Sequence, residues 1–221
     1  MSGTALPKAV LWDMDGTLID SAEYHWLTWR AALADLGVTL TREAFNGWFG
    51  SRNDRILSLY FGETLSAEDV RRIGESKESR YREMVRGEGI ALLPGVGQWL
   101  ARLRSAGWRQ AVASSAPPAN IDVLVEVLGL EDVFQATVSA EEVPEGKPAP
   151  DVFLRAAEKL GVPPGRCVVV EDAAVGVEAG RRGGMQTIGV QGPHSPAPLA
   201  ADVVTASLAD LPADTFDRLI G

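Results

Sequence analysis

Short apolar runs alternate with longer amphipathic segments along the chain. This pattern is typical of buried parallel strands that are connected by helices. It predicts an α/β fold with a Rossmann-like, doubly wound parallel sheet. The candidate strands are Ala9–Trp12, Arg109–Ala113, Ala136–Val138, Cys167–Val170 and Gln186–Val190, with a weaker one at Asp202–Thr205.

The first two candidate strands are too far apart for a single crossover. Roughly a hundred residues separate them, whereas connections longer than about 15 residues without structure of their own are uncommon. Residues 22–37 carry apolar side chains at helical spacing, and Ser66 opens a capping-box-like start to a charged helix that runs towards Arg86. We therefore expect residues 1–20 and 91–221 to form the core domain, and residues 21–90 to form an inserted small helical cap domain.

Three local features complete the outline of the predicted core. Pro94 suits the first turn of a helix that ends at Gly107, and residues 192–198 (GPHSPAP) predict a proline-rich surface loop. The single cysteine, Cys167, lies inside the apolar run CVVV and has no partner for a disulfide within the chain. We interpret it as a small buried core residue and not as a catalytic thiol.

Composition and charge narrow the classes of protein and of partner. The chain has 221 residues, of which 46% are hydrophobic, enough to bury a full core. No apolar run approaches the roughly 20 residues that span a bilayer, and the N-terminus lacks the layout of a signal peptide, so we expect a cytoplasmic protein without a membrane partner. The net charge of −9 argues against nucleic acid as a partner. We expect a monomer, with a dimer as the alternative, and any phosphate site must gather its positive charge locally.

The sequence DMDGT follows the first candidate strand. Side chains alternate in an extended chain, so Asp13 and Asp15 project to one side while Met14 points to the other. Two adjacent carboxylates suit a hard cation such as Mg²⁺, and Gly16 lets the backbone turn close to the site. The alternative is that one aspartate caps the following helix and the other is solvated.

Polar residues also follow three other candidate strands or their connections. Ser114 and Ser115 end the second strand, where hydroxyl and backbone N–H groups can hold an anion, although serines there are also common N-caps. Lys147 precedes a proline, and Glu171 and Asp172 follow the fourth strand. Because ligands of open parallel sheets bind at the carboxyl ends of the strands, we expect these groups to meet at one edge.

Four segments in this order resemble the four motifs of the haloacid dehalogenase superfamily: DMDGTLID, the run ending at Ser114, GKPAPDVF around Lys147, and VVVEDAAVGVEAG. The inserted helices resemble the cap of its β-phosphoglucomutase-like branch, and SAEYHWLTWRA is similar to the hinge segment of β-phosphoglucomutase. The resemblance covers the whole chain. It implies a core with an inserted cap, phosphate chemistry and a Mg²⁺ cofactor.

The resemblance also implies roles for the residues of the four motifs. Asp13 corresponds to the nucleophile that forms an aspartyl-phosphate, and Asp15 corresponds to the general acid and base. Ser114 and Lys147 correspond to the residues that hold the transferring phosphoryl group.

The implied metal site uses oxygen atoms from the same motifs. The Asp13 carboxylate, the Asp15 backbone carbonyl and the Asp172 carboxylate correspond to the ligands of Mg²⁺. Glu171 corresponds to a residue that orders metal-bound water without touching the metal.

The cap supplies candidate substrate-binding residues. By the resemblance, His25 lies near the hinge and links cap closure to proton transfer, and Arg52, Arg55 and Lys77 lie where the mutase holds a distal phosphate. The alternatives are a helix-packing role for His25 and solvated positions for Arg55 and Lys77. Arg52 is the strongest of these candidates because a guanidinium binds phosphate in a bidentate way.

We therefore expect a Mg²⁺-dependent phosphomonoester hydrolase or phosphotransferase that acts on a small phosphorylated metabolite, a sugar phosphate. A β-phosphoglucomutase is the alternative, but SAPPAN after Ser114 and GTLID after Asp15 differ from the mutase pattern and favour a phosphatase. The second aspartate of DMD argues against carbon–halogen cleavage. A phospho-accepting regulatory module is a further alternative, against which the cap argues.

Overall fold

A computed structural model describes residues 6–192 and 198–221 of the chain. The expected proline-rich loop falls almost wholly on residues 193–197, and it therefore lies outside the described residues. Within the described part, no helix combines the length and the apolar character needed to cross a membrane.

Six parallel strands form the sheet, in the order β3-β2-β1-β4-β5-β6. Every predicted strand is present: β1 (Ala9–Trp12), β2 (Arg109–Ser114), β3 (Ala136–Ser139), β4 (Cys167–Glu171), β5 (Gln186–Val190) and β6 (Val203–Thr205). The central strand β1 pairs with both β2 and β4, so that Trp12 lies opposite Val112 and Val170. This register brings the carboxyl ends of the three strands to the same edge.

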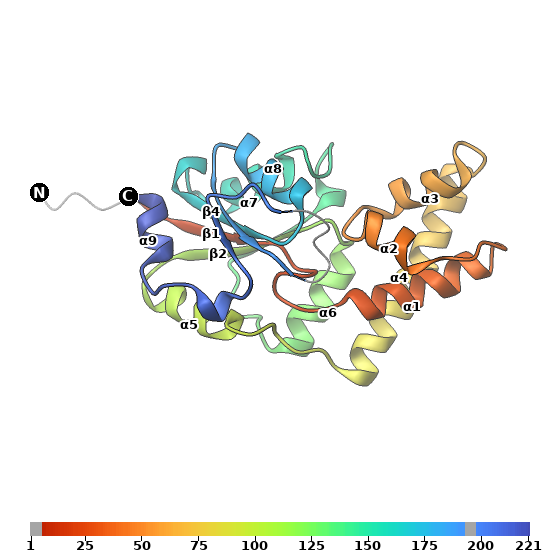
Figure 1. The fold of residues 1–221 in the computed structure, drawn as a ribbon, viewed down its shortest axis with the longest axis horizontal. Coiled ribbons are helices and arrows are strands. Elements are labelled where there is room, and N and C mark those ends of the chain that lie inside the picture. Colours follow the sequence, from red (N-terminus) through yellow and green to blue (C-terminus); the bar gives the residue numbers. More distant parts are fainter. Residues whose placement is uncertain (1–5, 193–197) are drawn as a thin grey trace, which may run out of the picture.

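Alternate residues of β1 face two different helical layers. Val10 and Trp12 belong to one hydrophobic cluster with α5 (Val96–Ser105), α6 (Pro118–Leu128) and α9 (Thr215–Ile220). Ala9 and Leu11 belong to a second cluster with α7 (Asp151–Leu160) and α8 (Ala174–Arg182). Figure 1 shows these layers on opposite faces of the sheet. The doubly wound α/β architecture is therefore confirmed.

The start of α5 differs from the prediction. The helix begins at Val96, so Pro94 lies before it, and it ends at Ser105, two residues before Gly107. Gly95 is the N-cap, with φ 85°, and a Cβ atom there would overlap the backbone of Leu208 and Ala209. The close approach of the short 3₁₀ helix Leu208–Asp210 therefore fixes the turn in front of α5.

Four helices connect β1 to α5 and form a separate layer at one end of the sheet (Figure 1). They are α1 (Ala22–Ala34), α2 (Arg42–Trp48), α3 (Asn53–Phe61) and α4 (Ala67–Glu88). An aromatic cluster with Trp26, Trp29 and Phe45 fills the space between them. On α4, however, Tyr81 and Val85 pack into the cluster of the sheet. We refer to α1–α4 as the cap and to the remainder as the core; their boundaries as domains stay a prediction.

Cys167 is fully buried at the start of β4, as expected for a core residue. Burial raises the pKa of its thiol to about 12. The thiol is therefore protonated and takes no part in the chemistry considered below.

Candidate active site

The chain turns sharply after β1, and this turn presents two aspartates. The Asp13 N–H donates to the carbonyl of Val170 (3.0 Å) and so extends the pairing of β1 with β4 by one residue. Gly16 has φ 85°, and a Cβ atom there would overlap the Asp172 carboxylate. The prediction that Gly16 allows the backbone to pass close to the site is confirmed.

Three carboxylates and one ammonium group meet at the ends of β1 and β4. Oxygen atoms of Asp13, Glu171 and Asp172 lie within 4.8 Å of one another. Lys147 Nζ donates to Asp13 Oδ1 (2.5 Å), to Glu171 Oε1 (2.7 Å) and to the carbonyl of Ala113 (3.2 Å). These groups come from three separate segments of the chain, as the sequence predicted for the edge of the sheet.

The charges of this cluster do not balance, because one ammonium group faces three carboxylates. Burial, together with the Glu171 carboxylate, raises the pKa of Asp13 to about 8 despite the contact with Lys147. Burial, together with the carboxylates of Glu171 and Asp13, raises the pKa of Asp172 well above its usual range. Burial alone would lower the pKa of Lys147, but Asp13 and Glu171 outweigh it and raise that pKa. The unbalanced negative charge favours the binding of a cation.

The set of donor atoms fits a hard divalent cation. Carboxylate oxygens are the ligands that Mg²⁺ prefers. Both oxygens of Glu171 already accept hydrogen bonds, Oε1 from Lys147 and Oε2 from the Ala173 N–H (2.8 Å). Asp13 and Asp172 are therefore the better direct ligands, with Glu171 in a supporting position.

The Asp15 carboxylate belongs to a different group of residues, on the cap side. Its Oδ1 accepts a hydrogen bond from Ser21 Oγ and lies 3.2 Å from His25 Nε2. Burial would raise the pKa of Asp15, but His25 and Ser21 outweigh it and lower the pKa. The Asp15 carboxylate is therefore held in its ionised form. It lies two positions after Asp13 in the chain.

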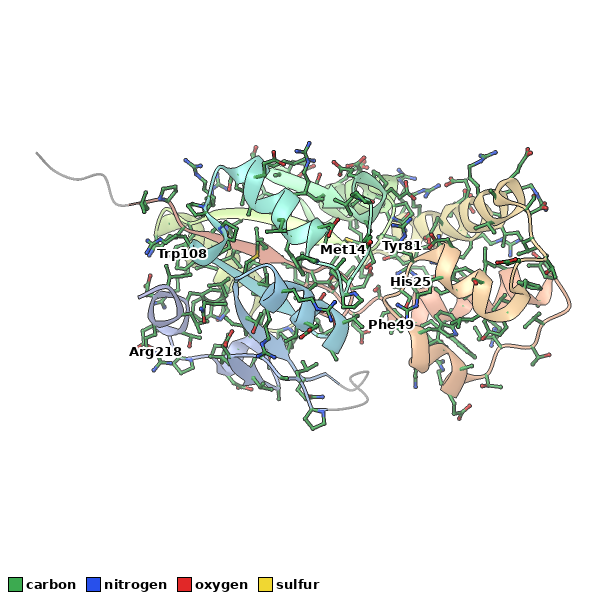
Figure 2. All side chains as sticks on the ribbon, turned by 90° about the horizontal axis from the view of Figure 1, so that it is seen from above. Met14, His25, Phe49, Tyr81, Trp108 and Arg218 are labelled. Atoms are coloured by element: carbon green, nitrogen blue, oxygen red, sulfur yellow. The ribbon has the colours of Figure 1, made fainter. Side chains whose placement is uncertain are left out.

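His25 and Lys77 lie behind Asp15 in the cap. The His25 ring stacks on Tyr81 with a centroid distance of 4.2 Å, and Figure 2 shows both beside Phe49 at the junction of cap and core. Lys77 Nζ lies 2.7 Å from His25 Nδ1 and donates to Glu78 Oε1 (2.9 Å). Only 1% of Lys77 is exposed, so its ammonium group serves His25 and Glu78 in this conformation. Contact of His25 or Lys77 with substrate stays a prediction.

Of the remaining predicted residues, Ser115, Arg52 and Arg55 line a cavity, whereas Ser114 is buried at the end of β2. Ser114 Oγ accepts a hydrogen bond from the Ala116 N–H (3.1 Å), so this serine also caps the turn before α6. Ser115 and Arg55 line a cavity of about 520 Å³ together with Lys147. Arg52 lines the same cavity, pairs with Asp54 (3.2 Å) and donates to the carbonyl of Ala140 in the core (3.1 Å). Three positively charged side chains, those of Arg52, Arg55 and Lys147, therefore line this cavity.

Three residues around Asp15 and His25 were not singled out from the sequence. The sequence gives only a weak indication of Ser21: it stands at the N-cap of α1, where serine is common in any helix. Glu78 and Asn120 have no such indication. They come from cap and core and are 42 residues apart, yet Asn120 Nδ2 donates to Glu78 Oε2 (2.6 Å).

Comparisons with known proteins agree with this geometry. The family described as haloacid dehalogenase-like hydrolase matches residues 7–184. The β-phosphoglucomutase of Bacillus subtilis is 34% identical, over 92% of this chain and 91% of its own length. Fructose-1-phosphate phosphatase YqaB of Escherichia coli is 33% identical, over 82% of this chain and 95% of its own length. The solved structure of CbbY from Rhodobacter sphaeroides in complex with xylulose-(1,5)bisphosphate has a TM-score of 0.86 at 26% identity and covers 93% of this chain and 96% of its own.

Proposed function

The chain belongs to the haloacid dehalogenase-like hydrolase family, and from this premise we propose that it is a Mg²⁺-dependent phosphomonoesterase or phosphotransferase for a small sugar phosphate. As a member of this family the chain is an enzyme, so the alternative of a regulatory module is set aside. The observation that carries the proposal is Lys147, which joins Asp13 to Glu171 and also lines a cavity that contains two arginines.

Asp13 is the proposed nucleophile. One of its carboxylate oxygens forms a bond to phosphorus while the bond from phosphorus to the leaving oxygen breaks, which gives an aspartyl-phosphate. The ammonium group of Lys147 reduces the repulsion between this carboxylate and the anionic ester, and Ser114 binds a phosphoryl oxygen. Two easier displacements then replace one difficult one.

Asp15 is the proposed acid and base. In its protonated form it gives its proton to the leaving oxygen, and the resulting carboxylate takes a proton from the water that attacks the aspartyl-phosphate. The hydrogen bonds from Ser21 and His25 favour the carboxylate, which is the form that the second step requires. Asp13 is then regenerated and inorganic phosphate is released.

The residues that would hold Mg²⁺ are Asp13, Asp172 and the backbone carbonyl of Asp15. When bound, the ion supplies positive charge that offsets the negative charge on the transferring phosphoryl group. The excess of carboxylates over ammonium groups supports this assignment, and Glu171 keeps both Lys147 and the turn at Ala173 in position.

The names of the relatives support a sugar phosphate as substrate, and they include both phosphatases and a mutase. A β-phosphoglucomutase that interconverts β-glucose 1-phosphate and glucose 6-phosphate is therefore kept as the second candidate. The contact of His25 with Asp15 favours it, because a mutase must deliver protons to a sugar hydroxyl in both directions.

The test is a screen of phosphorylated sugars with Mg²⁺, in which released phosphate is measured. We expect Asp13→Asn to lose at least about 10³-fold in kcat, because the variant lacks the attacking carboxylate but keeps its volume. Asp210→Asn changes an exposed aspartate that is not one of the site residues and is the matched control. Absence of turnover on all esters, or near-normal activity of Asp13→Asn, would overturn the proposal. Glucose 6-phosphate formed from β-glucose 1-phosphate and a bisphosphate activator would favour the mutase.

A further inference from the structure

The Glu78 carboxylate on α4 is a buried junction between cap and core. The residue is 2% exposed, and it accepts hydrogen bonds from three side chains. Oε1 accepts from Lys77 Nζ (2.9 Å) and Asn53 Nδ2 (2.8 Å), both in the cap. Oε2 accepts from Asn120 Nδ2 (2.6 Å), which comes from α6 in the core.

Asn120 is fully buried, and both the nitrogen and the oxygen of its side-chain amide are hydrogen-bonded to residues of α4. Its Oδ1 accepts a hydrogen bond from Arg82 Nη1 (3.0 Å), one turn after Glu78. The Asn120 amide of α6 in the core therefore hydrogen-bonds to both an anionic and a cationic side chain of α4 in the cap, those of Glu78 and Arg82. Its helix α6 begins a few residues after Ser114 and Ser115, the proposed phosphate-binding residues.

The same carboxylate is connected to Asp15 through two side chains. Burial lowers the pKa of Lys77, and the Glu78 carboxylate, its ion-pair partner, opposes that effect. An ammonium group can only donate, so Lys77 makes His25 Nδ1 an acceptor (2.7 Å). The proton of a neutral His25 ring then lies on Nε2, from where it donates to Asp15 Oδ1 (3.2 Å).

We propose that Glu78 and Asn120 form a latch: docking of the cap on α6 completes the hydrogen bonds of Glu78 and thereby positions Asp15 through Lys77 and His25. Glu78 and Asn120 are positioning residues in this scheme, since neither touches the reacting atoms. The inference rests on the proposed function, in which Asp15 is the acid and base.

The latch has a direct physical reason to couple docking with catalysis. When α4 leaves α6, Glu78 loses its hydrogen bond from Asn120, and Arg82 loses one of its two acceptors and keeps Glu75 on its own helix, so the undocked cap leaves charged groups with fewer partners. Lys77, His25 and Glu78 all belong to the cap, so the two contacts that form together on docking are those of Glu78 with Asn120 and of His25 with Asp15. Proton transfer is restricted to the closed enzyme.

The first test compares two leaving groups. The value of kcat/KM reports the steps up to formation of the aspartyl-phosphate, in which a sugar leaving group needs the proton of Asp15 and p-nitrophenolate does not. Glu78→Gln should lower kcat/KM about 10- to 100-fold for fructose 1-phosphate, or for the best alkyl phosphate of the screen, and less than about 3-fold for p-nitrophenyl phosphate. Glu83→Gln, an exposed change on the same helix, is the control and should alter neither. Equal losses on both substrates, or no loss, would overturn the latch.

The second test exchanges the donor and acceptor. Asn120→Asp places a carboxylate against Glu78 and should lower kcat/KM for the alkyl phosphate at least about 10-fold. In the double variant Glu78→Gln/Asn120→Asp, the amide at position 78 can donate to the carboxylate at position 120, which Arg82 can also pair. Because Lys77 still lacks its carboxylate partner in the double variant, we expect its loss in free energy of activation to be smaller than the sum of the two single losses, but not zero. Fully additive losses would contradict the latch.

A measurement without substrate separates failure of the latch from failure of the proposed function. Small-angle scattering should give a larger radius of gyration for Asn120→Asp than for the wild type, and the double variant should return towards the wild-type value. If the wild type cleaves no ester, the proposed function fails, whereas the scattering result still decides whether Glu78 and Asn120 hold the cap on the core. Identical radii for all variants would overturn the latch.

Discussion

The backbone of Gly16 passes so close to Asp172 that a Cβ atom on residue 16 would overlap the Asp172 carboxylate. Gly16 also has φ 85°, a conformation that residues with side chains rarely adopt. The turn after β1 and the acidic end of β4 can therefore approach each other only if residue 16 is glycine. This contact makes Gly16 a probe of the candidate metal site.

We expect Gly16→Ala to lower kcat at least about 10-fold and to raise the Mg²⁺ concentration that gives half-maximal activity, because the methyl group must displace Asp172 or the turn. Activity measured over a series of Mg²⁺ concentrations tests this. Gly47→Ala is the control, since Gly47 lies on an exposed part of α2 with nothing near its Cβ position. That change should keep activity and stabilise the chain by about 0.5–1 kcal/mol. Wild-type Mg²⁺ dependence in Gly16→Ala would refute the role given to the turn.

Removal of Mg²⁺ should abolish the activity of the enzyme. EDTA should abolish phosphate release, and added Mg²⁺ should restore it, because the charge of Lys147 alone does not balance Asp13, Glu171 and Asp172. Asp172→Ala should raise the half-saturating Mg²⁺ concentration by about 10-fold or more. The measurement is initial velocity against free Mg²⁺, with Asp210→Ala as an exposed control. Full activity in EDTA would show that the acidic cluster holds no essential metal.

Arg52→Ala should damage the reaction of a sugar phosphate more than that of p-nitrophenyl phosphate. If the guanidinium binds a substrate group away from the phosphorus, its loss should lower kcat/KM about 10-fold or more for the sugar ester only. Arg86→Ala removes an exposed arginine of α4 and serves as the control. Arg52 also donates to the carbonyl of Ala140. Equal losses on both substrates would therefore mean that it mainly joins cap to core.

Phe216 on α9 should matter for stability and not for catalysis. Its ring lies against Trp12, Trp99 and Trp108, with centroid distances of 6.2, 4.8 and 5.9 Å. Figure 2 shows Trp108 at the end of the molecule away from the cap. Phe216→Ala should cost about 3–5 kcal/mol of unfolding free energy in urea while kcat of the folded enzyme is retained. Leu59→Ala, at a 63% exposed position of the cap, should cost less than about 0.5 kcal/mol. A cost below about 1 kcal/mol for Phe216→Ala would mean that α9 does not close this core.

The sequence by itself determined the sheet and most of the site in the core. Apolar runs revealed all six strands because burial on both faces of a parallel sheet leaves a local pattern. Asp13, Lys147 and Asp172 could be expected to meet because parallel strands end at one edge, and the structure brings them together there. The turn at Gly16 was likewise predictable from its own short segment.

Only the tertiary structure decided what the cap does to these residues. Lys77 looked like a positive charge for a distal phosphate, yet its ammonium group is buried on His25 and Glu78. Glu78 and Asn120 carry no local pattern, because they meet only when a cap helix packs on a core helix 42 residues away in the chain. Periodicity reports whether a face of one element is buried, whereas the partner of a buried polar group depends on how two elements pack against each other.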